Sequence, residues 1–107
     1  MEEQGHLRVE SSIDPDGRTG RVTLSGEFDL DGVDAVSTVV DQLAERDLGT
    51  LLIDGSELTF LDSSGLRALL TAREKMQARG VRFRLVNASS TVIHVLDMTG
   101  TRTMLEG

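Results

Sequence analysis

A short apolar run, Leu51-Leu52-Ile53, constrains the fold of this chain most strongly. Gly49 and Gly55 bound it, and a brief continuous apolar run without alternation is typical of a strand that is buried on both faces. An amphipathic helical pattern follows, beginning at Asp62 to Ser64 and ending at Gly80, where a left-handed C-cap is expected. A buried strand that leads into a helix indicates an α/β fold.

The residues before this strand predict a hairpin and a first helix. Leu7–Glu10 and Val22–Ser25 each alternate apolar and polar residues, and the turn-forming residues of Asp14–Gly20 separate them. Apolar residues then recur at helical spacing, at Val33, Val36, Val40 and Leu43. Asp29 or Asp31 is suited to cap this helix, because a carboxylate accepts the free N–H groups of a helix start.

The residues after Ile53 predict a connection, a second helix, a strand and a third helix. The connection spans residues 55–61, and we expect its apolar side chains to turn inward: Leu58, Phe60 and Leu61. Val81–Leu85 alternates with arginines and predicts a strand with one polar face. Asn87–Ser90 is suited to cap a helix that ends at Thr99-Gly100, and Met104 and Leu105 allow a last short strand.

The predicted order is therefore β-β-α-β-α-β-α. The hairpin implies antiparallel pairing, whereas the strands that alternate with helices imply right-handed crossovers and parallel pairing. We expect an α/β fold with a mixed β-sheet packed with about three α-helices. A chain of 107 residues suits one domain, residues 1–107, in which 1–6 form a loose N-terminus and 101–107 a short C-terminal tail.

The composition excludes several classes of function. The formal net charge of −7 disfavours contact with nucleic acid or with an anionic membrane. The chain has no cysteine, and it has no apolar run of the roughly 20 residues that a membrane span requires. Its first residues are acidic, where a secretory signal peptide is basic. These features predict a soluble, cytoplasmic protein.

No arrangement of residues indicates an enzyme or a bound cofactor. The phosphate-loop and dinucleotide-binding motifs are absent, and the two histidines, His6 and His94, lie far apart in the sequence. A serine nucleophile elbow needs a leading glycine, and Leu61 occupies that position before Ser63. We therefore expect a protein that is not an enzyme and that binds neither a metal nor a cofactor.

The most informative polar residues stand between the buried strand and the second helix, in Asp62-Ser63-Ser64-Gly65. Asp and Ser are common caps, because their oxygens accept the N–H groups that a helix start leaves unpaired. The start of a helix also favours negative charge, which includes a phosphate. This segment is therefore either a structural cap or a serine that is modified, and the two interpretations are compatible.

Five segments together resemble a STAS domain, specifically that of a bacterial anti-sigma factor antagonist. They are Leu24–Asp29, Leu51–Asp54, Phe60–Leu66, Gly80 and Leu96–Gly100. The resemblance covers roughly Leu7 to Gly100. It implies a protein that binds an anti-sigma factor with serine kinase activity and so releases a sigma factor, which activates transcription in stress or sporulation signalling.

The resemblance also implies a switch and the residues that carry it. The anti-sigma factor uses its own ATP to phosphorylate the first serine of Asp-Ser-Ser-Gly, here Ser63, with Ser64 as the reserve. A serine phosphatase restores the unmodified form, and no cofactor belongs to this chain. The implied contact residues are Asp29, Asp62, Ser63, Ser64, Gly65, Leu66 and Arg67. The alternative is an unphosphorylated STAS scaffold or sensor module of a larger signalling or transporter assembly.

Overall fold

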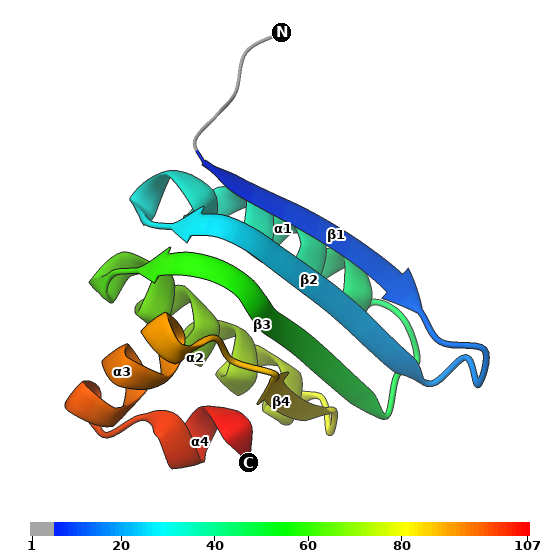
Figure 1. Cartoon of the computed structure of the whole chain (residues 1–107). Helices are drawn as coiled ribbons and strands as arrows, with labels where there is room; N and C mark the ends of the chain where they lie inside the picture. The colour runs from blue at the N-terminus through cyan, green and yellow to red at the C-terminus, as the bar shows by residue number, and fades with distance from the viewer. Residues whose placement is uncertain (1–5) are drawn as a thin grey trace, which may run out of the picture.

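The computed structural model describes residues 6–107, which form a four-stranded β-sheet with helices packed against it (Figure 1). In chain order the elements are β1 (Leu7–Ile13), β2 (Thr19–Phe28), a short 3-10 helix η1 (Leu30–Gly32), α1 (Val33–Ala44), β3 (Thr50–Leu61), α2 (Ser63–Ala78), β4 (Arg82–Val86), α3 (Ser90–Thr99) and α4 (Arg102–Glu106). Residues 1–5 of the predicted loose N-terminus lie outside the described residues.

The strand order in the sheet is β1-β2-β3-β4. β1 pairs antiparallel with β2, so the predicted hairpin is confirmed, and both of its strands are longer than the sequence pattern indicated. β3 pairs in parallel with β2 and with β4. The predicted mixed sheet and its order of strands and helices are therefore confirmed.

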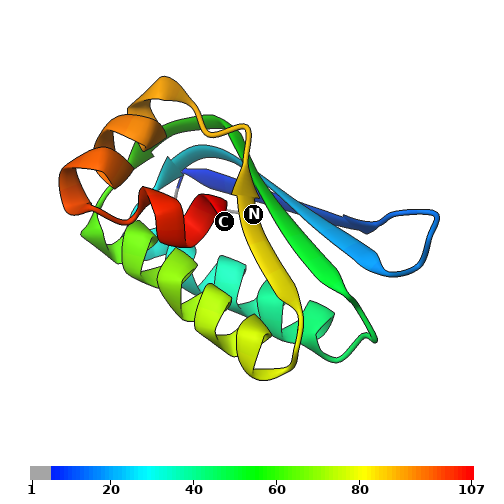
Figure 2. The same cartoon turned by 90° about the horizontal axis from the view of Figure 1, so that it is seen from below.

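The core lies on one face of the sheet, where α1 and α2 pack (Figure 2). In β4, Phe83 and Leu85 are buried and the two arginines are exposed, as predicted. The prediction that Leu51–Ile53 is buried on both faces is wrong, because Leu52 is only half-buried. Leu52 lies on the opposite face of the sheet, where its partners on the neighbouring strands are Arg21 and Arg84.

The prediction of a connection over residues 55–61 is also wrong, because β3 continues to Leu61. Two register shifts against β2, after Thr23 and after Gly26, place extra residues in β3. Such bulges bend a strand and change which side chains face inward. Leu58 and Leu61 are buried as expected, whereas Phe60 is 45% exposed and does not turn inward.

The ends of α2 and α3 lie where the sequence predicted them. Asp62 caps α2, and Gly80 follows it with φ of +76°, the left-handed conformation that glycine adopts at low cost. Ser89 caps α3, and Gly100 ends it with φ of +71°. These boundaries depend on local hydrogen bonds, so local sequence was enough to place them.

The C-terminal tail is helical, so the predicted last strand is wrong. α4 lies beside β4, where the Leu105 side chain is fully buried and Met104 is 44% exposed (Figure 1). The Arg84 Nε donates to the Glu106 carbonyl oxygen at 3.2 Å. The tail thus packs beside the last strand through one apolar side chain and does not extend the sheet by backbone pairing.

Replacing Ser89 with alanine is expected to lower the free energy of unfolding by about 1–2 kcal/mol. The Ser89 hydroxyl donates to the Leu58 carbonyl at 2.7 Å and accepts the Val92 N–H at 3.3 Å, so one side chain joins α3 to β3. Urea denaturation measures the change. Ser90→Ala is the matched control, because Ser90 is the next residue and is exposed. Equal stability of the two variants would show that the Ser89 bonds contribute nothing net.

Candidate functional site

The junction of β3 and α2 is built around the Asp62 side chain. Its Oδ1 accepts the backbone N–H of Gly65 at 3.0 Å, and its carbonyl oxygen accepts the N–H of Leu66 at 2.9 Å. The side chain therefore satisfies one of the N–H groups that the start of α2 leaves without an intrahelical partner. The predicted cap is confirmed, and it fixes the direction in which α2 leaves the sheet.

The end of β2 lies directly against this junction. The Asp62 N–H donates to the Phe28 carbonyl oxygen at 3.3 Å. A Cβ atom added at Gly65 would lie 2.5 Å from that same carbonyl oxygen and 2.8 Å from Leu61 Cδ1, so only glycine permits this close approach. Because Asp29 follows Phe28, the contact brings Asp29 next to Asp62, although they are far apart in the sequence.

Asp29 organises its own turn in the same way. Its side chain caps η1 by accepting the N–H of Asp31 at 3.1 Å, and α1 begins directly after η1. The prediction that Asp29 or Asp31 caps the first long helix is thus wrong in detail, because Asp29 caps the 3-10 turn that precedes it. The outcome is that two helix starts, each with an aspartate cap, stand side by side at one edge of the molecule.

The predicted site residues of α2 differ in their exposure to solvent. Ser63 is the first residue of α2 and is exposed, as is Arg67. Ser64 is half-buried, whereas Gly65 and Leu66 are buried and support the turn from within. The structure therefore brings all of the predicted residues together, and it leaves the Ser63 hydroxyl the more accessible of the two serines.

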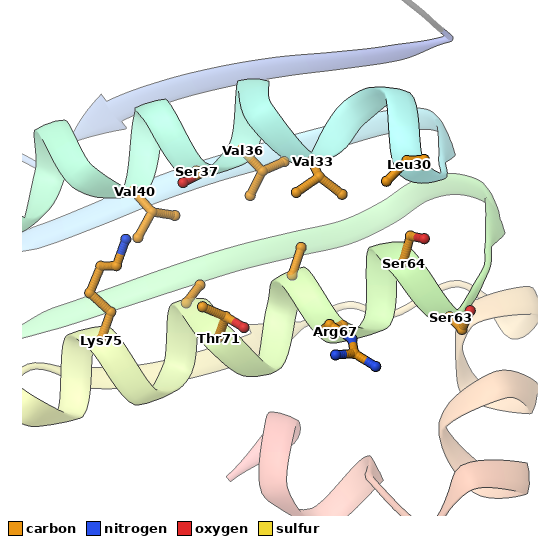
Figure 3. Close-up of a pocket in the computed structure, with 12 residues that line it drawn as sticks. Leu30, Val33, Val36, Ser37, Val40, Ser63, Ser64, Arg67, Thr71 and Lys75 are labelled. Atoms are coloured by element: carbon orange, nitrogen blue, oxygen red, sulfur yellow. The ribbon is translucent and has the colours of Figure 1, made fainter.

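A groove runs between α1 and α2 and ends at these serines (Figure 3). Its volume is about 390 Å³. Five of the residues that line it are apolar and buried or half-buried, whereas the half-buried Ser64 and Lys75 are polar; the apolar ones are Val33, Val36, Val40, Ala68 and Ala72. The exposed residues beside it include Ser37, Thr71 and Leu30. We call this feature the α1–α2 groove.

The two ends of the α1–α2 groove differ. Lys75 of α2 lies at the end farthest from Ser63 (Figure 3), and it forms an ion pair with Asp41 of α1. At the other end, Leu30 lies close to the start of α2 and is 70% exposed. Sequence reasoning missed this groove. The local sequence gives one indication of it, which is the apolar residue Leu30 between Asp29 and Asp31 in a turn.

Within residues 6–107, no group of three or more His, Cys, Asp or Glu side chains could hold a metal ion. Over the same residues, no helix has both the length and the apolar character needed to cross a bilayer. His6 and His94 are exposed and do not line the α1–α2 groove. The β3–α2 junction presents two carboxylates, two hydroxyl groups and one guanidinium group, those of Asp29, Asp62, Ser63, Ser64 and Arg67.

The model of the STAS domain family matches residues 12–106. This chain belongs to the STAS domain family. A search of curated protein sequences gave no match. The family assignment agrees with the resemblance that the sequence segments indicated.

Solved structures extend the comparison of this STAS domain. The anti-sigma factor antagonist SpoIIAA in its unphosphorylated form has a TM-score of 0.77 at 23% identity, covering 92% of this chain and 85% of that chain. An anti-sigma factor antagonist from Mycobacterium paratuberculosis has a TM-score of 0.80 at 25% identity, with coverages of 92% and 82%. A sulfate transporter family protein from Wolinella succinogenes has a TM-score of 0.69 at 19% identity, with coverages of 88% and 75%.

SpoIIAA of Bacillus is also known in a phosphorylated form, which matches this STAS domain with a TM-score of 0.64 at 26% identity and coverages of 87% and 84%. The structural relatives thus include antagonists of anti-sigma factors and a transporter family protein. They show that the chain has the fold of these proteins.

Proposed function

We propose that this STAS domain is an anti-sigma factor antagonist that phosphorylation of Ser63 switches off. The observation that carries the proposal is the position of Ser63, exposed as the first residue of a 16-residue helix in the β3–α2 junction. The unmodified protein binds an anti-sigma factor that has serine kinase activity, and this binding releases a sigma factor. The similarity to anti-sigma factor antagonists, one of them known in phosphorylated form, supports this proposal.

The charge of a phosphate on Ser63 acts on the partner more than on the domain itself. A phosphate adds about −1.5 to −2 charge at neutral pH. The start of α2 tolerates that charge, because its N–H groups and the helix dipole favour an anion. Asp62 precedes Ser63, and Asp29 lies near it, so the modified surface becomes strongly acidic. Any partner that covers this surface must then desolvate several like charges together.

The chain itself supplies a surface and a hydroxyl group in this scheme, and it performs no catalysis. ATP and the phosphotransfer chemistry belong to the anti-sigma factor. A serine phosphatase removes the phosphate and restores binding. The net charge of −7 suits a protein that acts in the cytoplasm on other proteins rather than on nucleic acid or membranes.

Release of a sigma factor tests this function. Each serine-kinase anti-sigma factor of the source organism is purified with its sigma factor as a complex, and this STAS domain is added without nucleotide. We expect free sigma factor and a new complex in gel filtration with one of these pairs. If no pair releases its sigma factor, the proposed function is wrong.

The second candidate is an unphosphorylated scaffold or sensor module of a signalling or transporter assembly. The similarity to a sulfate transporter family protein favours it. Purification of the endogenous protein distinguishes the two candidates. A large native assembly or a permease partner supports the module, whereas a small complex with an anti-sigma factor supports the antagonist.

A further inference from the structure

We infer that the α1–α2 groove receives an apolar side chain of the anti-sigma factor, inserted beside Ser63. This inference rests on the proposed function, because it assigns a second contact to the same partner. The groove adjoins the polar surface of the β3–α2 junction, because Ser63, Ser64 and Arg67 are among its lining residues. It extends along α2 from Ser63 to Lys75, a distance of about 18 Å at 1.5 Å per helical residue.

The lining of the groove fits an apolar occupant. α1 contributes the valines Val36 and Val40, α2 contributes Ala68 and Ala72, and these short side chains leave a space of about 390 Å³ between the two helices. Sites for small polar molecules combine an apolar lining with a few buried polar groups that orient the ligand. The polar residues that line the groove are exposed or half-buried, and none of them is buried, so the buried part of its lining is apolar.

The residues at one end of the groove identify the occupant as the protein bound at Ser63. Ser63 and Ser64 themselves line the groove, at the end opposite to Lys75, so a partner that contacts Ser63 already lies against it (Figure 3). Leu30 lines the groove at the same end and is 70% exposed (Figure 3). A partner seated on Ser63 would cover Leu30 and reach the groove with the same surface.

The positive charge of Arg67 indicates which kind of residue lies next to the inserted side chain. Arg67 lines the groove one turn after Ser63, and it is in none of the ion pairs among residues 6–107. A carboxylate next to the inserted side chain would meet Arg67. The partner segment is therefore an aliphatic or aromatic residue beside an acidic one. A phosphate on Ser63, four residues before Arg67, would compete for the same guanidinium group.

Filling the groove tests this inference. Ser37→Phe and Ala68→Leu place new side-chain atoms in the groove, whereas Thr38→Phe and Ala78→Leu introduce the same two residues at exposed positions of the same helices outside it. We expect the two groove variants to weaken binding of the anti-sigma factor by about tenfold or more, and the two controls to stay within about twofold. Calorimetric titration measures the affinity, and thermal unfolding confirms that all four variants fold.

Each other outcome overturns the inference. If the groove variants bind as the wild type does, the groove is no contact, and the proposed function still stands. If the wild type binds no anti-sigma factor, both proposals fail together. A dimer that becomes monomeric in Ser37→Phe by light scattering would make a second copy the occupant. An amphiphile that native mass spectrometry finds on the wild type, and not on Ser37→Phe, would make a small molecule the occupant.

Discussion

Replacing Gly65 with alanine is expected to lower the free energy of unfolding by about 3 kcal/mol, because the added methyl group has no space. Its Cβ would lie 2.5 Å from the Phe28 carbonyl oxygen and 2.8 Å from Leu61 Cδ1, and the first of these is backbone that cannot rotate away. For a domain of this size, the unfolding midpoint would fall by roughly 10 °C or more. Thermal and urea denaturation measure both quantities.

Gly49→Ala is the matched control for this substitution. The three atoms nearest to the Cβ that it adds all belong to the Arg18 guanidinium group, the closest at 3.2 Å, and an exposed arginine can move aside. We expect a change within about 0.5 kcal/mol for this variant. Wild-type stability of Gly65→Ala would contradict the account, since it would show that β2 and the start of α2 separate without cost.

Replacing Ser63 with aspartate is expected to weaken binding of the anti-sigma factor by about 100-fold or more while leaving the fold intact. The substitution introduces a charge on the exposed first residue of α2, next to Asp62 and Asp29, where a bound partner excludes water. The helix dipole stabilises the same charge within the domain, by about 0.3–1 kcal/mol. Calorimetric titration measures the affinity, and urea denaturation measures the stability.

Ser63→Asn separates the effect of charge from that of shape, because asparagine has nearly the same size as aspartate and is neutral. We expect this variant to retain affinity within about tenfold of the wild type, since a neutral amide costs far less to desolvate than a carboxylate. Equal losses in the two variants would mean that the hydroxyl group itself, and not its negative charge when modified, governs binding. Loss of folding in Ser63→Asp would favour a purely structural role for this serine.

Much of the fold follows from short-range patterns. The caps at Asp62 and Ser89 and the left-handed glycines after α2 and α3 depend on hydrogen bonds between near neighbours, so the sequence places these helix ends correctly. The polar face of β4 was also predictable, because arginine and apolar residues alternate along it without interruption. Features of this kind are encoded within a few residues.

The features that escaped prediction depend on distant parts of the chain. Phe60 faces solvent because bulges in β3 shift the alternation, and these arise from the pairing of β3 with β2. Leu52 lies between Arg21 and Arg84 because the pairing of β3 with β2 and β4 places all three on the face of the sheet opposite to α1 and α2 (Figure 2). The tail is helical because Leu105 is buried beside β4. None of these arrangements leaves a periodic pattern in the local sequence.

The candidate site also has a part that the sequence predicts and a part that only the structure shows. The serines and Asp62 form one contiguous segment, so the sequence singles them out, and the resemblance to the STAS family adds Asp29. The α1–α2 groove is invisible in the sequence, because its shape depends on how closely two separate helices pack. The valines and alanines that line part of it resemble an ordinary helix core in the sequence, and only the structure shows that a groove lies between them.

Phosphate transfer to a single hydroxyl group tests the central claim most directly. The wild type, Ser63→Ala and Ser64→Ala are incubated with the anti-sigma factor that binds the wild type and with ATP, and intact-mass spectrometry measures the product of each reaction. We predict that the wild type and Ser64→Ala each gain the mass of one phosphate group and that Ser63→Ala gains none. Phosphate on Ser63→Ala, or none on the wild type, would contradict the account.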